Sequence, residues 1–285
     1  MGGTGTKTGA AMGGRRKEAM NYLEQYYNSY DEDGRLLSQH GQVEYITTMT
    51  YIHKYLEEQR VSQEPGEIRI LEVGAGTGRY SLALAKEGYS VDAVELTEHN
   101  LKILRSKITE QMQINAIQGN ALDLSRYEEN TFDLVLVLGP LYHLYTREDQ
   151  LQALWEAVRV ARSGGYVLAA YCMNESVVLQ YEFLGGHIKE DRASGKLSAD
   201  YHCLSEPEDL FVMMRKEEIE ALTQQLPAER RGLIATDGAT GYMRELVDAM
   251  DQETFARWVE WHLLTCERQD LIGATNHSLD ILQKI

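Results

Sequence analysis

Short apolar runs alternate with stretches of helical periodicity along most of the chain. Residues 68–73, 91–95, 114–117, 132–138 and 166–170 form apolar runs rich in aliphatic residues, which suits buried parallel strands. Between these runs, apolar residues recur at spacings of three and four, the pattern of amphipathic helices. Repeated strand–helix units predict an α/β fold with a parallel sheet and helices on both faces.

A glycine-rich turn follows the first of these strands. Gly74, Gly76 and Gly78 alternate along the chain, and Tyr80 then begins a helical stretch that ends at Gly88. Glycine is needed where a chain turns with positive φ or where a ligand touches the backbone. The free N–H groups at the start of the next helix then face that ligand. The segment therefore predicts a ligand site at the end of the first strand.

The second strand supplies an acidic residue for that site. It ends at Glu95, about 20 residues after the glycines, where a ribose-binding carboxylate is expected. Nicotinamide enzymes and S-adenosylmethionine enzymes share this feature, and it argues against a purely structural turn. The dinucleotide fingerprint is G-x-G-x-x-G, whereas this chain has G-x-G-x-G with Arg79 in the place of the last glycine. The glycine spacing therefore favours S-adenosylmethionine.

Further helices and strands are expected outside this core. Apolar and tyrosine positions at helical spacing predict two N-terminal helices, at 18–30 and 42–58. Thr146, with Asp149 three residues later, has the pattern of a helix N-cap. The C-terminal part is expected to contain helices at 208–226, 242–249 and 254–268, and strands at 231–235 and 278–284.

Composition and periodicity divide the chain into five parts. Residues 1–14, rich in glycine, threonine and alanine, are expected to be disordered, and residues 15–64 to form a helical lid. Residues 65–172 form the cofactor-binding core. Residues 173–206 show little periodicity and are too long for an idle connection, so we expect a substrate-side insertion. Residues 207–285 complete the domain and carry a helical insertion.

Charge and cysteine content narrow the classes of function. The formal net charge is −16, and the chain has no Lys/Arg cluster beyond residues 15–17, so a nucleic-acid partner is not expected. No apolar run approaches the ~18 residues that cross a bilayer. The three widely spaced cysteines suggest reduced thiols, with neither a disulfide framework nor a metal site. We expect a cytoplasmic protein that binds a small molecule, with no membrane partner and no metal; the oligomeric state stays open.

The segment Leu71-Glu-Val-Gly-Ala-Gly-Thr-Gly78 resembles the first motif of the class I S-adenosylmethionine-dependent methyltransferases. Four segments in the order of that family, from Ile70 to about Ala170, carry the resemblance. The family has a Rossmann-like, mostly parallel sheet of seven strands, of which the last is inserted antiparallel. The resemblance implies this fold, with 278–284 as the antiparallel strand. It also implies S-adenosylmethionine as cofactor and S-adenosylhomocysteine as product.

The resemblance further implies a set of cofactor contacts. Glu72 and the glycine turn would border the methionine part, Glu95 would hold the ribose hydroxyls, and the Leu138 backbone would accept from the amino group. Three further residues would contact adenine, although the family often has Asp at the position of Asn120. The predicted cofactor set is Glu72, Gly74, Ala75, Gly76, Gly78, Glu95, Leu96, Asn120, Ala121 and Leu138, with Arg35 and Tyr27 from the N-terminal lid.

The segment Gly139-Pro-Leu-Tyr-His-Leu144 follows the fourth strand and resembles that of a group of bacterial small-molecule methyltransferases. Those proteins also resemble residues 26–35 and 44–48, which would form the lid, with Arg35 as partner of the cofactor carboxylate. Because ligands lie at the carboxyl ends of the strands, Tyr142 and His143 are the catalytic candidates. The substrate-binding candidates are Tyr26, Tyr30, Tyr171 and His202.

Methyl transfer from a sulfonium is an in-line displacement, so the protein mainly aligns the nucleophile, the methyl group and the sulfur. A base is needed only when the nucleophile carries a proton. His143 is the leading candidate because histidine titrates near neutrality, although it could equally be a structural residue bonded to a neighbouring loop. The sequence predicts a methyltransferase of the EC 2.1.1 type acting on a small molecule. The alternatives are a protein or RNA methyltransferase, a nicotinamide-dependent oxidoreductase and a non-catalytic cofactor-binding protein.

Overall fold

A single mixed sheet forms the centre of the protein, which we describe from a computed structural model covering residues 5–30, 34, 37–59 and 64–285, with side chains from residue 16 onward. The strand order is β3-β2-β1-β4-β5-β8-β7, and the short β6 pairs with β5. The strands are β1 (Arg69–Val73), β2 (Ser90–Glu95), β3 (Ile114–Gln118), β4 (Phe132–Val137), β5 (Ala161–Met173), β6 (Met213–Met214), β7 (Ala228–Ala235) and β8 (His277–Lys284).

The last strand runs against its neighbours. β1 to β5 pair in parallel, whereas β8 pairs antiparallel with both β5 and β7. Leu279 lies opposite Ala170 on one side and Ile234 on the other. The predicted Rossmann-like sheet with an inserted antiparallel strand is therefore confirmed, and β6 is a two-residue addition to it.

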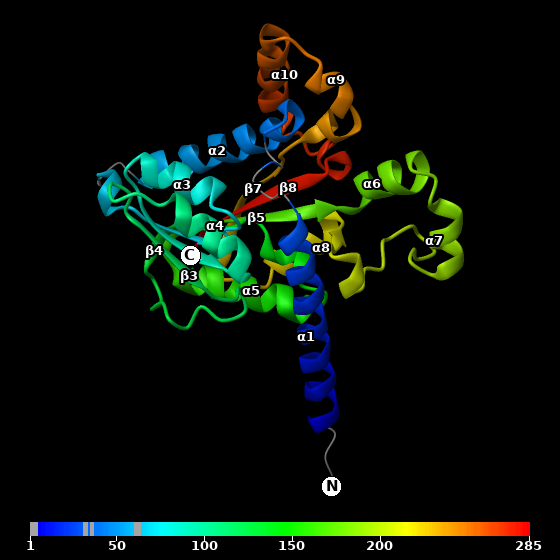
Figure 1. Cartoon of the computed structure of the whole chain (residues 1–285), viewed down its shortest axis with the longest axis horizontal. Coiled ribbons are helices and arrows are strands. Elements are labelled where there is room, and N and C mark those ends of the chain that lie inside the picture. Colours follow the sequence, from blue (N-terminus) through cyan, green and yellow to red (C-terminus); the bar gives the residue numbers. More distant parts are fainter. Residues whose placement is uncertain (1–4, 31–33, 35–36, 60–63) are drawn as a thin grey trace.

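Helices cover both faces of the sheet, because alternate strand residues point to opposite sides. In β4, Val135 and Val137 join the core beneath α5 (Arg147–Val160) and α8 (Lys216–Thr223), whereas Leu134 and Leu136 join the core beneath α2 (Gln39–Gln59) and α3 (Arg79–Lys86). Figure 1 shows these two layers above and below the strands. A further helix, α4 (Glu98–Lys107), packs beside α3, whereas α10 (Gln252–Thr265) lies outside the core and buries only His262.

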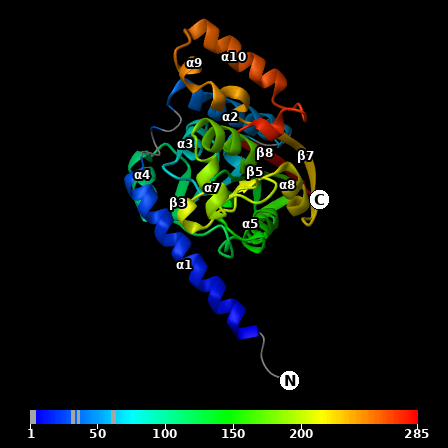
Figure 2. The same ribbon diagram turned by 90° about the vertical axis from the view of Figure 1, so that its right-hand side faces the viewer.

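Two helices precede the sheet. In α2 (Gln39–Gln59) the predicted face is buried, with Met49, Ile52 and Leu56 in the core. α1 (Gly5–Ser29) begins well before the predicted start at residue 18 and includes most of the segment expected to be disordered. That part of α1 has no apolar stripe, so the sequence gives no helical signal there, and in Figure 2 it projects away from the body of the protein. None of the described helices is long and apolar enough to cross a membrane.

The second half of the chain departs further from the prediction. The insertion contains α6 (Asn174–Val177), the π-helix η4 (Val178–Leu184) and α7 (Ile188–Ser194), and α9 (Arg244–Asp248) follows β7. The helix predicted at 208–226 is wrong in its first half, because Met213 and Met214 pair with the end of β5 as β6. The ladder partners of these two residues lie forty positions away, and local periodicity cannot reveal them.

Candidate active site

A cavity of about 330 Å³ lies at the carboxyl ends of the parallel strands, below α1. Its walls come from the segments that follow β1, β2, β3 and β4. This is where open α/β sheets bind ligands. Twelve of the predicted site residues line it: Tyr27, Glu72, Gly74, Ala75, Gly76, Glu95, Leu96, Asn120, Ala121, Leu138, Tyr142 and His143.

The glycine turn forms the floor of this first cavity. Gly74 has φ +77°, and a Cβ there would lie 2.7 Å from the ring of Pro140. The N–H groups of Gly74 and Ala75 both donate to the carbonyl of Val94, at 2.8 and 3.0 Å, which ties the turn to β2. Glycine is thus required both by the backbone conformation and by the close approach of the loop after β4.

Gly78 has a different place from the one predicted. It has φ +91° and does not line the cavity; instead, a Cβ there would lie 2.2 Å from Leu104 of α4. Gly78 therefore allows α3 and α4 to pack closely, and we no longer count it among the residues that touch a ligand.

Glu95 presents a fixed, buried carboxylate to the first cavity. Its Oε2 accepts from the Gly76 N–H at 2.8 Å, and its Oε1 accepts from the N–H and the hydroxyl of Thr97, both at 2.8 Å. Thr97 occupies the N-cap position of α4, but its hydroxyl bonds Glu95 and makes no cap hydrogen bond. A carboxylate oxygen accepts more than one hydrogen bond, so Glu95 can also receive the hydroxyls of a ribose.

Glu72 is a second carboxyl group in the wall of the first cavity. It is only 2% exposed, and its Oε2 accepts from the N–H of Ser81 at 2.8 Å and from the Ser81 hydroxyl. Burial raises the pKa of Glu72 to about 8; the Ser81 hydrogen bonds oppose the rise and the charge of Glu95 adds to it. Without a ligand, Glu72 is therefore mostly protonated at neutral pH.

Several polar atoms on the walls lack partners, which is what a polar ligand would supply. Arg79 Nε and Asn100 Oδ1 are buried and have no hydrogen-bond partner within the described part of the chain. Asn120 Oδ1 accepts from the Leu122 N–H at 2.9 Å, while no described residue bonds its Nδ2. The Leu138 carbonyl accepts from the Tyr142 hydroxyl at 2.9 Å. Buried polar groups are costly when unpaired, so these atoms fit a ligand with ribose, adenine and amino acid groups.

One face of α1 forms the roof of the first cavity. The sequence analysis expected a helical lid but named only Tyr27 among the α1 residues that line this cavity. Arg16, Ala19, Met20, Leu23 and Tyr27 line it, at the three- and four-residue spacing of a single helical face. Arg16 is anchored to Asp149 at the start of α5, with Nε 3.2 Å from Oδ2. Leu23 is buried although it lies on an otherwise polar helix. The apolar signal, Met20-x-x-Leu23, was present but too short to stand out.

His143 is held in place by both of its ring nitrogens. Its Nδ1 lies 2.8 Å from the Leu210 carbonyl, which can only accept, so Nδ1 carries the proton. Its Nε2 then accepts from the Tyr27 hydroxyl at 3.1 Å. Burial lowers the pKa of His143 to about 4, against the hydrogen bond to Leu210. His143 is therefore neutral, and both of its ring nitrogens already have hydrogen-bond partners. This arrangement favours a positioning role over the predicted role as base.

A second cavity of about 350 Å³ adjoins the first. Tyr27 and Tyr142 line both cavities and so stand between them. The other aromatic walls are Tyr26, Tyr30 and Phe211, and Tyr26 and Tyr30 were predicted to contact substrate. Its polar walls were not predicted: His40 and Glu44 from α2, Asp237 after β7, Arg244 from α9, and Asn276 and His277 at the start of β8.

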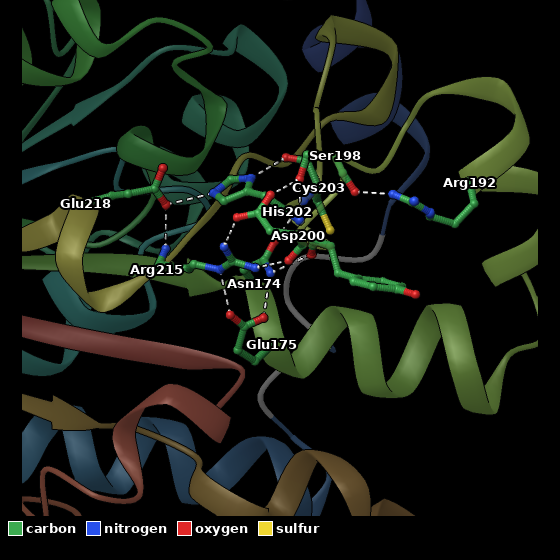
Figure 3. Close-up of polar contacts among 10 residues, drawn as sticks. Asn174, Glu175, Arg192, Ser198, Asp200, His202, Cys203, Arg215 and Glu218 are labelled. Carbon is green, nitrogen blue, oxygen red and sulfur yellow. Dashed lines mark hydrogen bonds and ion pairs between the residues drawn. The ribbon is translucent and has the colours of Figure 1, made fainter.

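The structure does not bring the other two substrate candidates to either cavity. Tyr171 is 1% exposed within the core under α5 and α8. His202 lies in the polar network of the insertion in Figure 3, where its Nε2 is 2.7 Å from Glu218 and its Nδ1 is 2.9 Å from the Cys203 carbonyl. Its pKa is raised by Glu218, as expected for a structural ion pair. Arg35, the predicted carboxylate partner, lies outside the described residues.

The segments that line the first cavity belong largely to a part of the chain that is similar to known proteins. Residues 71–169 match the family model described as a methyltransferase domain. This methyltransferase domain covers about a third of the chain and contains β1 to most of β5, with the glycine turn and Glu95. In this match and in its sheet order, the chain is similar to the class I S-adenosylmethionine-dependent methyltransferases, whose cofactor is S-adenosylmethionine.

The curated relatives match less than half of this chain. The chain is 32% identical to a demethylmenaquinone methyltransferase of Lysinibacillus sphaericus over 39% of this chain and 46% of that protein. It is 26% identical to a glycine/sarcosine N-methyltransferase of Aphanothece halophytica over 44% and 48%. The chain spans less than half the length of these curated relatives.

The fold is similar to that of solved structures over a larger part of the chain than the sequence is similar to the curated relatives. The crystal structure of geranyl diphosphate C-methyltransferase from Streptomyces coelicolor, determined with S-adenosyl-L-homocysteine, covers 94% of this chain and 98% of its own, with a TM-score of 0.55. The sequence identity is 10%, so this likeness concerns the fold.

Proposed function

We propose that the protein is an S-adenosylmethionine-dependent methyltransferase that transfers a methyl group to a small-molecule acceptor by in-line displacement. The observation that carries the proposal is the pair of adjoining cavities at the carboxyl edge of the sheet. One is lined by the glycine turn and Glu95, and the other is lined by tyrosines and charged groups. We place the enzyme in the cytoplasm, in keeping with its three free cysteines.

The first cavity is the proposed cofactor site. Glu95 would hold the ribose hydroxyls, and Asn120 Nδ2 would donate to the adenine ring. Glu72 and the Leu138 carbonyl would receive the amino group, and the backbone of the glycine turn would border the methionine part. The cofactor supplies the methyl group and its own thioether leaving group, so the residues of this chain need only bind, align and exclude water.

The second cavity is the proposed acceptor site. Tyr27 and Tyr142 separate the two cavities, so the methyl group would pass between their rings, where neutral His143 fixes the position of Tyr27. A volume of about 350 Å³ suits a small molecule. The net charge of −16 also disfavours nucleic acid.

Calorimetric titration tests the cofactor half of this proposal. S-adenosylmethionine and S-adenosylhomocysteine are expected to bind with micromolar affinity, and Glu95→Ala is expected to abolish that binding. Glu110→Ala is the matched control, because Glu110 is exposed in the turn before β3. Binding of NADH in place of both adenosyl compounds would contradict the proposal. Methyl transfer is then measured with radiolabelled S-adenosylmethionine against a panel of amines, phenols, thiols and carboxylic acids.

A further inference from the structure

Three ionisable side chains from distant parts of the chain meet in the wall of the second cavity. Glu44 comes from α2, Asp237 follows β7, and His277 begins β8. β7 and β8 pair antiparallel, with Ala235 opposite Ser278, and this pairing brings Asp237 beside His277 although forty residues separate them. Asp237 and His277 had no role in the sequence analysis, and Glu44 appeared there only as part of the lid segment 44–48.

Asp237 is fixed by its surroundings. It is 5% exposed, and its Oδ1 accepts from the Thr275 hydroxyl and from the N–H groups of Asn276 and His277, at 2.5, 2.9 and 3.1 Å. Burial acts to raise the pKa of Asp237, but the charge of His277 and these hydrogen bonds outweigh it, and the pKa is lowered. The group is therefore a carboxylate whose remaining oxygen, Oδ2, has one defined orientation.

That remaining oxygen orients His277. Asp237 Oδ2 lies 2.8 Å from His277 Nδ1, and Glu44 Oε2 lies 3.5 Å from the same nitrogen. A carboxylate only accepts, so Nδ1 carries the proton. Nε2 has no hydrogen-bond partner among the described residues and is absent from their buried unpaired atoms, and the side chain is 29% exposed. Nε2 therefore faces the space of the second cavity.

We infer that His277 Nε2 accepts the proton of the acceptor during methyl transfer, with Asp237 fixing the tautomer and Glu44 strengthening the base. This inference rests on the proposed function. The acceptor would then be a small molecule whose nucleophile carries a proton, as an amine, hydroxyl or thiol does. The nucleophile forms a bond to the methyl carbon, the carbon–sulfur bond breaks with its electron pair left on sulfur, and the proton moves to Nε2.

The charges around His277 set the pH at which it can act. Burial lowers its pKa, but the carboxylates of Glu44 and Asp237 and the Cys172 thiol outweigh burial and raise the pKa well above its ordinary value. The rate should therefore rise with pH through that pKa. The other titratable or charged groups that line the cavity are His40, Tyr26, Tyr27, Tyr30, Tyr142 and Arg244, and His40 is paired with Asp248.

A divalent cation is the competing interpretation, because ligand atoms of Glu44, Asp237 and His277 all lie within 4.8 Å of one another. The hydrogen bonding favours a proton relay instead. Asp237 Oδ1 is already filled by its three donors, and the 2.8 Å contact from Oδ2 to Nδ1 is that of a hydrogen bond. No cation is needed to explain the arrangement.

NMR titration of the full chain with labelled histidine tests the inference without a known acceptor. His277→Gln identifies the signal, which should show an Nδ1-protonated ring in the neutral form and a pKa above the ordinary ~6.5. Glu44→Gln and Asp237→Asn should each lower that pKa. Glu87→Gln is the matched control: Glu87 pairs with the surface His53 at 2.8 Å and lines neither cavity, so the His277 signal should not move. A neutral His277 ring protonated on Nε2, or a His277 pKa that is unchanged in Glu44→Gln, overturns the inference.

The second readout is the rate of methyl transfer to those compounds of the acceptor panel that the protein methylates. His277→Gln should lower kcat by roughly 100-fold or more while leaving calorimetric binding of S-adenosylmethionine unchanged. Glu44→Gln should shift the inflection of the pH–rate profile in parallel with the NMR pKa, which a merely structural role would not do. An unchanged kcat, or activity that EDTA abolishes and Mg²⁺ or Mn²⁺ restores, overturns the inference. Failure of the cofactor to bind instead contradicts the proposed function and leaves the NMR result standing.

Discussion

At the scale of single residues, Glu72 couples ligand binding to a proton. Its pKa of about 8 means that the empty site holds a neutral carboxyl group at pH 7. The proposed cofactor brings an ammonium and a sulfonium beside it, and nearby positive charge favours the carboxylate. Binding at pH 7 should therefore release close to one proton, seen as a binding enthalpy that depends on the ionisation enthalpy of the buffer. Glu72→Gln should remove that dependence, and a wild-type enthalpy equal in all buffers would contradict the assignment.

His143 makes stability depend on pH in the acidic range. Its folded pKa of about 4 lies below the ordinary unfolded value of ~6.5, so the unfolded chain takes up the proton first. The stabilisation is present above ~pH 6.5 and is lost as the pH falls towards 4. Urea unfolding at pH 5 and pH 7 should show a smaller loss of stability for His143→Asn than for the wild type. An equal loss in both proteins would mean that His143 is not held neutral.

At the scale of elements, two glycines with positive φ allow the stability cost of backbone strain to be distinguished from the cost of a packing clash. Gly78 has φ +91° and Leu104 at 2.2 Å from a Cβ, whereas Gly164 has φ +75° and nothing within 4 Å. Gly164→Ala should cost about 1–2 kcal/mol of unfolding free energy from the left-handed backbone alone. Gly78→Ala should cost roughly 2–5 kcal/mol, because it also forces α3 from α4. Equal costs in urea unfolding would show that the Leu104 side chain moves aside without a measurable loss of stability.

The elements also show what the sequence could predict. β1 and β4 were found because buried parallel strands are nearly continuous apolar runs, and the glycine turn was found because positive φ selects glycine. β6 was missed because its partner lies far along the chain. Tyr171 was placed at the substrate because it follows an apolar strand, but the register of β5 turns it into the core. Asp237 and His277 gave no signal, because only the β7–β8 pairing brings them together.

At the scale of the whole molecule, the first cavity is built from segments that lie far apart along the chain. Its walls come from α1, the glycine turn and the loops after β2, β3 and β4. A ligand there binds only the folded state and should stabilise it by about 2.7 kcal/mol at 100 times its Kd. S-adenosylhomocysteine at that concentration should raise Tm by about 5 °C. Thermal melts should show no such rise for Glu95→Ala, and a rise of equal size in that variant would place the ligand elsewhere.

The antiparallel strand in the middle of the sheet has a consequence for biosynthesis. β8, the last strand along the described chain, lies between β5 and β7, so both remain without that neighbour until residues 277–284 leave the ribosome. The first cavity needs only segments translated before residue 150, whereas the second needs α1, α2 and residues 276 and 277. A nascent chain could thus form the proposed cofactor pocket early, but the proposed acceptor site would stay incomplete until residues 276 and 277 have been translated.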